Sequence, residues 1–381
     1  MTTGTTTPRR RPRDRRQQIL AAARDRFARQ GYHRVAMADV AAAVDIGASA
    51  LYRHVRGKQE LLLAVLDEDL ARLEEAEPDP DGLARVALER RGFGLLWERE
   101  AGHLPEDEQH AVRVRLRRLA GSLAGRVPGP DADVRGWAAL SVLGSPSYHR
   151  TTLDDDRFHG LIADAARACL VVGLPDPPPS SAAVPHEPPR LVPASRREAL
   201  LAAAIRLFAA RGYPSVGLAD IGAATGIAGP SVYHHFLTKA DLLEAALRRG
   251  EERLWLGLHH ALARADDAAG ALAGLVEDYT AFASTDPQLV GTLLSEIVHL
   301  PGDRHAAFRA HQLEYVAEWV GLLRAARPDL AVREARVLVH AALAVVNSLT
   351  RIRHLRARPG RDAEIAALAR AVLQPLVLES E

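Results

Sequence analysis

Cysteine is almost absent from this sequence, and long apolar runs are absent altogether. Cys169 is the single cysteine, and no Cys-x-x-Cys spacing exists. Because one thiol cannot form a disulfide within the chain, we expect a reducing compartment. No run reaches the roughly 18 apolar residues that a membrane helix needs, and no apolar stretch follows the arginines near the start. The sequence therefore predicts a cytoplasmic protein without a signal peptide or a membrane span.

Motifs for catalysis and metal binding are also missing. The sequence has no P-loop, no Gly-x-Ser-x-Gly, no His-Glu-x-x-His and no Cys and His residues at metal-ligand spacing, and its 16 histidines are scattered. We therefore predict no enzyme activity, no catalytic residue, no metal and no cofactor. Aromatic residues make up 5% of the chain against 48% hydrophobic residues, so the core must be largely aliphatic.

Length and charge indicate two similar units. The chain has 381 residues, which favours two domains over one, and a net charge of +1. That charge is uneven: residues 8–60 contain thirteen Lys or Arg against five Asp or Glu, and residues 189–241 contain six against three. Two positive segments in an otherwise acidic chain suit binding to a phosphate backbone, although such segments also occur as plain solvated surface.

An internal repeat relates these two segments. Shifting the chain by 181 positions aligns residues 15–66 with 196–247 without a gap, and 23 of the 52 aligned positions are identical. Eight prolines lie between Gly173 and Ser195, and that density predicts an extended spacer between the copies.

Each copy has the pattern of a helix-turn-helix unit. In the first copy, apolar spacing predicts a helix over 14–29, ended by Gly31, and then two short helices over 36–44 and 49–54. The last of these suits a DNA major groove about 12 Å wide.

The second copy repeats the pattern, with short helices over 218–225 and 230–236. A longer helix follows each copy, near Lys58 and Lys239, and helical patterns fill the remainder. The expected fold is therefore all-α, with two similar helical modules.

These residues resemble the N-terminal domain of TetR family regulators, twice in register. The motif of the first copy is Phe27, Gly31-Tyr32, Asp39-Val40-Ala41, Ile46, Leu51-Tyr52-Arg53-His54-Val55, Lys58 and Leu61-Leu62. The second has Phe208, Gly212-Tyr213, Asp220-Ile221, Val232-Tyr233-His234-His235-Phe236, Lys239 and Leu242-Leu243. The resemblance implies six parts: a disordered basic arm (1–13), a first DNA-binding domain (14–60), a helical C-terminal domain (61–172), a linker (173–194), a second DNA-binding domain (195–241) and a helical ligand-binding and dimerisation domain (242–381).

The resemblance also implies which residues face double-stranded DNA. They are Ser49, Ala50, Tyr52, Arg53, His54 and Lys58 in the first copy, and Pro230, Ser231, Tyr233, His234, His235 and Lys239 in the second. An arginine such as Arg53 suits a guanine edge, and the lysines suit phosphate. Other interpretations remain open: the tyrosines as core residues, His54 and His235 packed on the first helix, the His234-His235 pair on a metal, and the lysines as solvated helix starts.

Three departures from the family pattern weaken this expectation, chiefly for the second copy. Ala36 and Gly217 stand where a capping Ser or Thr is common, and Ala38 and Ala219 stand where a polar residue often touches phosphate. Gly222 replaces the usual alanine at a tight helix crossing.

The C-terminal part of each half carries two further helical patterns, over 134–150 and 157–172 in the first half and over 332–355 and 363–376 in the second. In the family the equivalent helices pair two subunits. We therefore expect either an intramolecular pseudodimer, which would bind an asymmetric operator, or a homodimer with four DNA-binding units.

The family also encloses an inducer in its C-terminal helices, which implies a small organic ligand here. The longer second half is the expected site, and the first is expected to have lost its pocket. The candidate lining residues are Tyr279, Phe282, Leu293, Glu296, His299, Phe308, Tyr315, Trp319 and Asn347.

The resulting expectation is a sequence-specific transcriptional regulator of the bacterial cytoplasm, located at the nucleoid through DNA binding. Repression released by a ligand is the expected mode. The alternative is a ligand-binding or interaction module of the same fold that has lost operator binding.

Overall fold

The computed structural model describes residues 12–125, 129, 131–176, 193–227 and 229–374, and all regular structure within them is helical. Most of the expected basic arm and linker, residues 1–11 and 177–192, lies outside the described residues. No helix of the described part combines the length and apolar character needed to span a bilayer.

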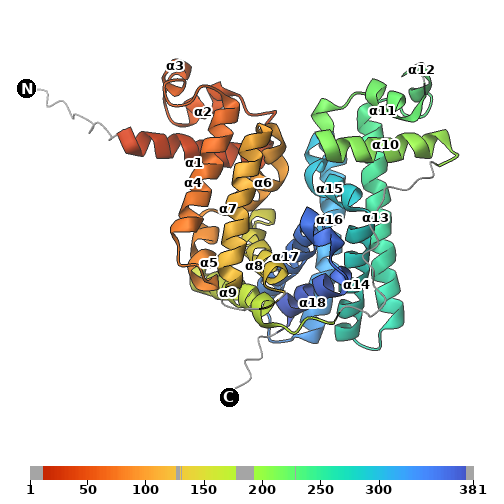
Figure 1. The fold of residues 1–381 in the computed structure, drawn as a ribbon. Helices are drawn as coiled ribbons and strands as arrows, with labels where there is room; N and C mark the ends of the chain where they lie inside the picture. The colour runs from red at the N-terminus through yellow and green to blue at the C-terminus, as the bar shows by residue number, and fades with distance from the viewer. Residues whose placement is uncertain (1–11, 126–128, 130, 177–192, 228, 375–381) are drawn as a thin grey trace, which may run out of the picture.

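The first half forms nine α-helices and two short 3-10 helices (Figure 1). They are α1 (Pro12–Gln30), α2 (Met37–Ala43), α3 (Ala48–Leu51), α4 (Lys58–Glu75), α5 (Pro80–Glu89), α6 (Phe93–Glu100), η1 (Ala101–His103), α7 (Glu106–Ala124), α8 (Ala132–Gly144), η2 (Ser145–Tyr148) and α9 (Asp155–Val171).

The second half repeats this order with longer helices after its helix-turn-helix. They are α10 (Arg196–Arg211), η3 (Tyr213–Ser215), α11 (Leu218–Thr225), α12 (Gly229–Val232), α13 (Lys239–Arg264), α14 (Ala268–Thr285), α15 (Pro287–Ser295), η4 (Ile297–His299), α16 (Gly302–Ala326), α17 (Val332–Leu349), η5 (Arg353–Ala357) and α18 (Arg361–Leu373).

Matched local signals set matched helix ends in the two halves. Gly31 and Gly212, which directly follow α1 and α10, have φ of 82° and 74°, a region that favours glycine. Asp79 and Asp267 cap α5 and α14, accepting from backbone N–H groups at 2.8 Å and 2.7 Å.

We call residues 14–60 and 195–241 the first and second reading heads, and residues 61–172 and 242–381 the first and second bodies. Each head packs around one buried phenylalanine, Phe27 or Phe208, both fully inaccessible to solvent. The two heads lie at the same end of the molecule, at the top of Figure 1.

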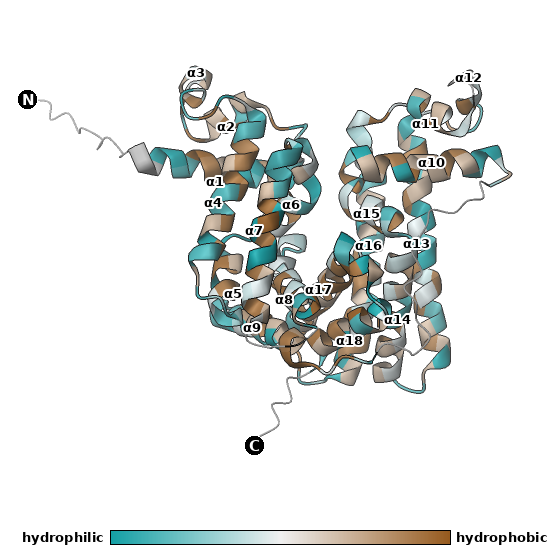
Figure 2. Cartoon of the chain, viewed as in Figure 1, coloured by the Kyte–Doolittle hydropathy of each residue, from teal (hydrophilic) through white to brown (hydrophobic). Residues whose placement is uncertain are grey.

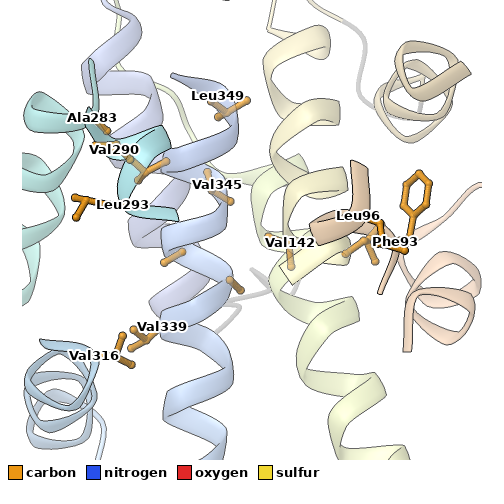
Figure 3. Packing of buried hydrophobic residues seen from close by; sticks show 14 of the residues in the cluster. Phe93, Leu96, Val142, Ala283, Val290, Leu293, Val316, Val339, Val345 and Leu349 are labelled. Atoms are coloured by element: carbon orange, nitrogen blue, oxygen red, sulfur yellow. The ribbon is translucent and has the colours of Figure 1, made fainter. Parts of the chain in front are cut away.

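The two bodies meet through α8 and α9 of the first half and α17 and α18 of the second. Figure 2 shows that hydrophobic residues make up much of α17 and α18, and Figure 3 shows α8 and α17 side by side with Val142 and Val345 between the helices. Both valines are fully buried. We call this four-helix contact the junction.

The junction helices are shorter than the sequence pattern predicts. The helix expected over 134–150 ends at Gly144 and continues as η2, because Pro146 cannot donate a helical hydrogen bond. The helix expected over 332–355 ends at Leu349, where the hydroxyl of Thr350 donates to Val346 O at 2.8 Å.

Polar pairs surround the apolar centre of the junction. Arg351 pairs with Glu98 at 2.6 Å, His354 pairs with Asp133 at 2.7 Å, and Arg157 pairs with Glu334. Each pair joins one half to the other, so charge complementarity as well as apolar burial fixes how the halves sit together.

Candidate nucleic-acid interface

The short helices α3 and α12 follow tight turns of the same geometry. Asp45 and Gly226 occupy equivalent positions in these turns and both have positive φ, 53° and 68°. After each turn a backbone N–H donates back to the preceding helix, from Ile46 to Ala41 O at 3.1 Å and from Ile227 to Gly222 O at 3.0 Å. The turns therefore hold α3 and α12 at fixed angles to α2 and α11.

Gly222 is required by this close packing. A Cβ at that position would lie 2.8 Å from Ile227 O and 3.0 Å from a methyl group of Val232. In the first head the equivalent residue is the buried Ala41, so the second turn lies closer to its helix than the first.

Both reading helices bury one side and expose the other. Leu51 and Val232 are fully buried, whereas Tyr52 and Tyr233 are 52% and 54% exposed. Each tyrosine is therefore about half-exposed and is not fully buried in the core. The helices expected over 49–54 and 230–236 are shorter than predicted, since α3 ends at Leu51 and α12 at Val232. The remaining predicted contacts are exposed at Ser49, Arg53, His54 and His234 and half-buried at Ala50, Ser231 and His235.

Pro230 belongs to α12, but its side chain lies outside the described part of the structure. Among the described residues, no group of three His, Cys, Asp or Glu side chains is arranged to hold a metal ion.

Lys58 and Lys239, predicted to contact phosphate, are half-buried and each makes contacts within its own head, while the phosphate contact stays a prediction. Lys58 Nζ donates to Val35 O at 3.1 Å and lies 4.5 Å from the ring centre of Tyr32. Lys239 Nζ donates to the carbonyls of Tyr213 and Val216, each at 2.8 Å, and lies 4.1 Å from the ring centre of Tyr213. Burial lowers the pKa of both lysines. They connect the start of α4 or α13 to the loop before the reading helices.

The caps of α2 and α11 show how these helices begin without a capping Ser or Thr. Asp39 Oδ2 accepts from Ala36 N at 3.0 Å, and Asp220 Oδ2 accepts from Gly217 N at 2.7 Å. Neither Ala36 nor Gly217 supplies a side-chain cap to the first-turn N–H groups of its helix.

The structure also reveals a second repeated motif that the sequence reasoning missed, Glu-x-x-His-Leu-Pro at 100–105 and 296–301. Glu100 accepts from Tyr32 N at 3.1 Å, and Glu296 accepts from Tyr213 N at 3.1 Å. The motif recurs at an offset of 196 rather than 181, which is why an ungapped comparison does not find it.

The histidines of the motif complete the contact between head and body. The ring of His103 stacks on Tyr32 with centroids 4.5 Å apart, and His299 stacks on Tyr213 at 5.3 Å. Burial lowers the pKa of each histidine to about 4, with nearby positive charge adding to the effect. Each head therefore rests on its body through an aromatic stack and a buried carboxylate.

One ion pair distinguishes the two heads. In the first half, Arg24 of α1 binds the fully buried Asp69 of α4 at 2.5 Å. The equivalent positions in the second half are Ile205 and Gly250, and a Cβ at Gly250 would overlap Leu293. The first head is therefore fixed by charge where the second is fixed by apolar packing.

A cavity of about 870 Å³ lies between the halves. Five of the predicted ligand residues line it: Tyr279, Phe282, Leu293, Tyr315 and Asn347. Glu296, His299, Phe308 and Trp319 are not among the lining residues. Glu296 and His299 instead contact Tyr213, and Trp319 packs edge-on behind Tyr279 and Tyr315. The cavity also includes a wall from the first half, residues 147–152, which sequence reasoning missed.

In the first half, α7 and α8 approach closely. A Cβ at Gly136 of α8 would overlap the carbonyl oxygen of Ala120 on α7. This contact needs glycine and leaves no space between the two helices at that level.

Both heads are similar to a known family of DNA-binding domains. The model of the bacterial regulatory proteins of the tetR family matches residues 19–65 and again residues 200–246. These two matches cover the two reading heads and the starts of the helices that follow them.

Two curated relatives are transcriptional regulators. The chain is 35% identical over 99 residues to the HTH-type transcriptional activator FasR of Mycolicibacterium smegmatis, which covers 26% of this chain and 45% of that protein. It is 29% identical over 135 residues to the HTH-type transcriptional repressor KstR2 of Rhodococcus jostii, covering 35% of this chain and 66% of that protein. The chain thus spans about half to two thirds of the length of these relatives.

Solved structures with a similar fold include a TetR-family transcriptional regulator from Bordetella parapertussis and KstR2 of Mycobacterium tuberculosis. The first is 20% identical, with a TM-score of 0.46, and covers 50% of this chain and 100% of that chain. The second is 23% identical, with a TM-score of 0.42, and covers 48% of this chain and 94% of that chain. The two family matches and the repeated helix-turn-helix show that the chain carries two TetR-like modules in tandem.

Proposed function

We propose that this protein is a DNA-binding transcriptional regulator that binds one operator through two non-identical reading helices of a single chain. The observation that carries the proposal is the placement of α3 and α12 at the same end of the molecule (Figure 1). An exposed tyrosine, Tyr52 or Tyr233, directly follows each of these helices. The junction supports a fixed spacing between them, as a two-fold operator with half-sites about 34 to 36 Å apart requires.

The single chain is the proposed binding unit, because the junction helices are already paired within it. Arg53, in the turn after α3, aligns with His234, in the turn after α12, and Ser49 aligns with Pro230. Arginine suits a guanine edge in a way that histidine does not, so the preferred operator is an imperfect, asymmetric palindrome.

The relatives are named both activator and repressor, and we propose repression here. A small organic ligand in the cavity between the halves would change the spacing of the reading heads and release the operator. The protein is proposed to act in the cytoplasm, in contact with chromosomal DNA and without a catalytic step.

The test is the mass of the purified full chain by light scattering, free and bound to DNA selected from a random double-stranded library at stated salt. One chain per selected duplex supports the proposal. Two chains per duplex would replace it with a homodimer carrying four reading helices. Failure to select any sequence would favour a module of this fold that has lost operator binding.

A matched pair of variants separates sequence-specific contact from general charge. Arg53→Ala combined with His234→Ala removes one exposed side chain from the turn after each reading helix, and we expect selected-site binding to fall about 10- to 1,000-fold. Arg264→Gln removes a positive charge at the exposed end of α13 and is expected to leave binding within about twofold.

A further inference from the structure

The cavity between the halves has an unusual charge for a mostly apolar space. Six arginines line it against two carboxylates, with neither lysine nor aspartate among the lining residues. Glu98 pairs with Arg351 at 2.6 Å, and one oxygen of Glu251 lies 3.5 Å from His311, while its Oε1 is buried without a hydrogen-bond partner among the described residues. The arginine charge is therefore not balanced by the cavity wall.

Three of the arginines lack a partner of their own. Arg150, Arg333 and Arg336 make neither a hydrogen bond nor an ion pair within the described residues. Arg336 is half-buried, on the face of α17 that lines the cavity. A guanidinium that is partly removed from water and left unpaired is a site for an anion, because a carboxylate or phosphate satisfies its planar fork of N–H donors.

Two histidines from opposite halves lie beside Arg336. His149 and His340 stack with centroids 4.7 Å apart, and Nε2 of His149 is buried without a hydrogen-bond partner among the described residues. The charge of Arg336 contributes to lowering the pKa of both histidines, after burial, and Arg309 contributes at His340. Arg336, Arg309 and the histidine pair therefore occupy one end of the cavity together.

The opposite end of the cavity is largely apolar. Phe282, Leu293 and Val316 line it, and the hydroxyl of Tyr279 donates to Asn347 Oδ1 at 2.8 Å. Arg336 and Asn347 lie on the same helix, α17, eleven residues or about 16 Å apart at 1.5 Å per residue. The cavity is therefore elongated, with a basic end and an apolar end.

We propose that this cavity binds one anionic amphiphile per chain, with a carboxylate or phosphate head group at Arg336 and Arg309 and an apolar body directed toward Tyr279 and Phe282. The regulatory meaning of this binding rests on the function proposed above, but the binding itself does not depend on DNA.

The same cavity reaches the first reading head and not the second. Ala28 and Arg29, at the end of α1, are lining residues, whereas no residue of the second head is among them. Arg99, also in the wall, donates to Ala28 O at 2.9 Å. A bound amphiphile would therefore act first on the contact between α1 and the first body, so that the half-site bound by α3 is released before the half-site bound by α12.

The test is titration of the full chain, without DNA, with decanoate, decyl phosphate and decanol below their micelle-forming concentrations. Trp255 lines the cavity, so its fluorescence reports entry. We expect at least one of the two anions to bind about tenfold or more tightly than decanol, and whichever anion binds better identifies the head group. Decanol binding as tightly as both anions, or no binding of either anion, would overturn the proposal.

Variants locate the head group. Arg336→Gln is expected to weaken anion binding about tenfold and leave decanol unchanged, whereas Arg336→Lys retains part of the affinity and Arg264→Gln retains all of it. If Arg336→Gln lowers the melting temperature, Arg309→Gln, at an exposed position, serves in its place. Unchanged anion affinity in both glutamine variants would refute the assignment. The titration contains no DNA, so its outcome does not depend on operator binding. If the protein binds no operator, the proposed function is wrong but the measured binding of the amphiphile still holds.

Discussion

Arg351 Nη2 lies 2.6 Å from Glu98 Oε1, and the two residues are 253 positions apart in the chain. This ion pair joins the end of α17 to α6 of the other half, and Arg351 Nε also donates to Asn347 O at 2.7 Å. Burial is the largest single influence and lowers the pKa of Arg351, but the charge and hydrogen bond of Glu98 together with Tyr148 and Tyr279 outweigh it, so the pKa is raised. The pair lies beside the junction and connects it to the cavity, because Glu98 lines the cavity wall.

Replacing Glu98 with Gln is expected to reduce the free energy of unfolding by about 1 to 3 kcal/mol, because it leaves the Arg351 charge partly buried without its partner. The measurement is urea denaturation. Glu277→Gln is the matched control, since it breaks the Arg370 pair, whose glutamate is 63% exposed, and should change stability by about 0.5 kcal/mol or less. Equal effects of the two variants would contradict a structural role for the Glu98 pair.

The stacked pair His149 and His340 predicts how stability depends on pH. Burial lowers the pKa of His149 to about 3 and that of His340 to about 4, from an ordinary value of 6.5. Below about pH 6.5 these two histidines therefore become protonated in the unfolded chain while they stay neutral in the folded chain. The contribution of the two neutral histidines to the free energy of unfolding is fully present above pH 6.5. It decreases as the pH falls from about 6.5 to 4, by roughly 1.4 kcal/mol per pH unit for each histidine.

Denaturation midpoints measured from pH 8.5 to 5 check this expectation. His149→Gln should flatten the slope below pH 6.5 by about one proton and leave the slope between pH 7.5 and 8.5 unchanged. If the denaturation midpoint of His149→Gln depends on pH below 6.5 as steeply as that of the original chain, the pKa of His149 is not lowered in the folded protein.

Glu296→Ala is expected to loosen the second reading head from its body. It leaves the N–H of Tyr213 without its buried acceptor, at a cost of about 1 to 3 kcal/mol, and removes the partner of His299. Hydrogen exchange at Tyr213 and in α11 should accelerate, while α17 and α18 keep their protection.

Glu318→Ala, at an exposed position on α16, is the control for Glu296→Ala and should not change exchange in the head. Unaltered exchange at Tyr213 in the Glu296 variant would mean that the carboxylate does not hold the head in place.

Exchanging the aligned residues Arg53 and His234 is expected to exchange the two half-site preferences. Arg53→His together with His234→Arg should move a guanine preference, worth about 1 to 3 kcal/mol, from one half of the selected operator to the other. Both positions are exposed, so folding should be preserved. Selection from the same random library checks the result, and an unchanged consensus would show that these side chains do not specify bases.

Much of the local structure follows from the sequence alone. The repeated heads and the glycines that end α1 and α10 are determined by residues within a few turns of one another. Helical hydrogen bonds and apolar periodicity act over that range, so the pattern of each copy is sufficient to predict them.

The tertiary structure decided what contiguous residues cannot specify. Lys58 and Lys239 have the sequence position of phosphate contacts, yet carbonyls and a tyrosine ring from the preceding loop bind them. The wall at residues 147–152, the unpaired Arg336 and the Glu98 to Arg351 pair arise only when the halves meet. The residues in these contacts are far apart in the sequence, so no local pattern predicts that they meet. Their burial and pairing depend on which surfaces the complete fold brings together.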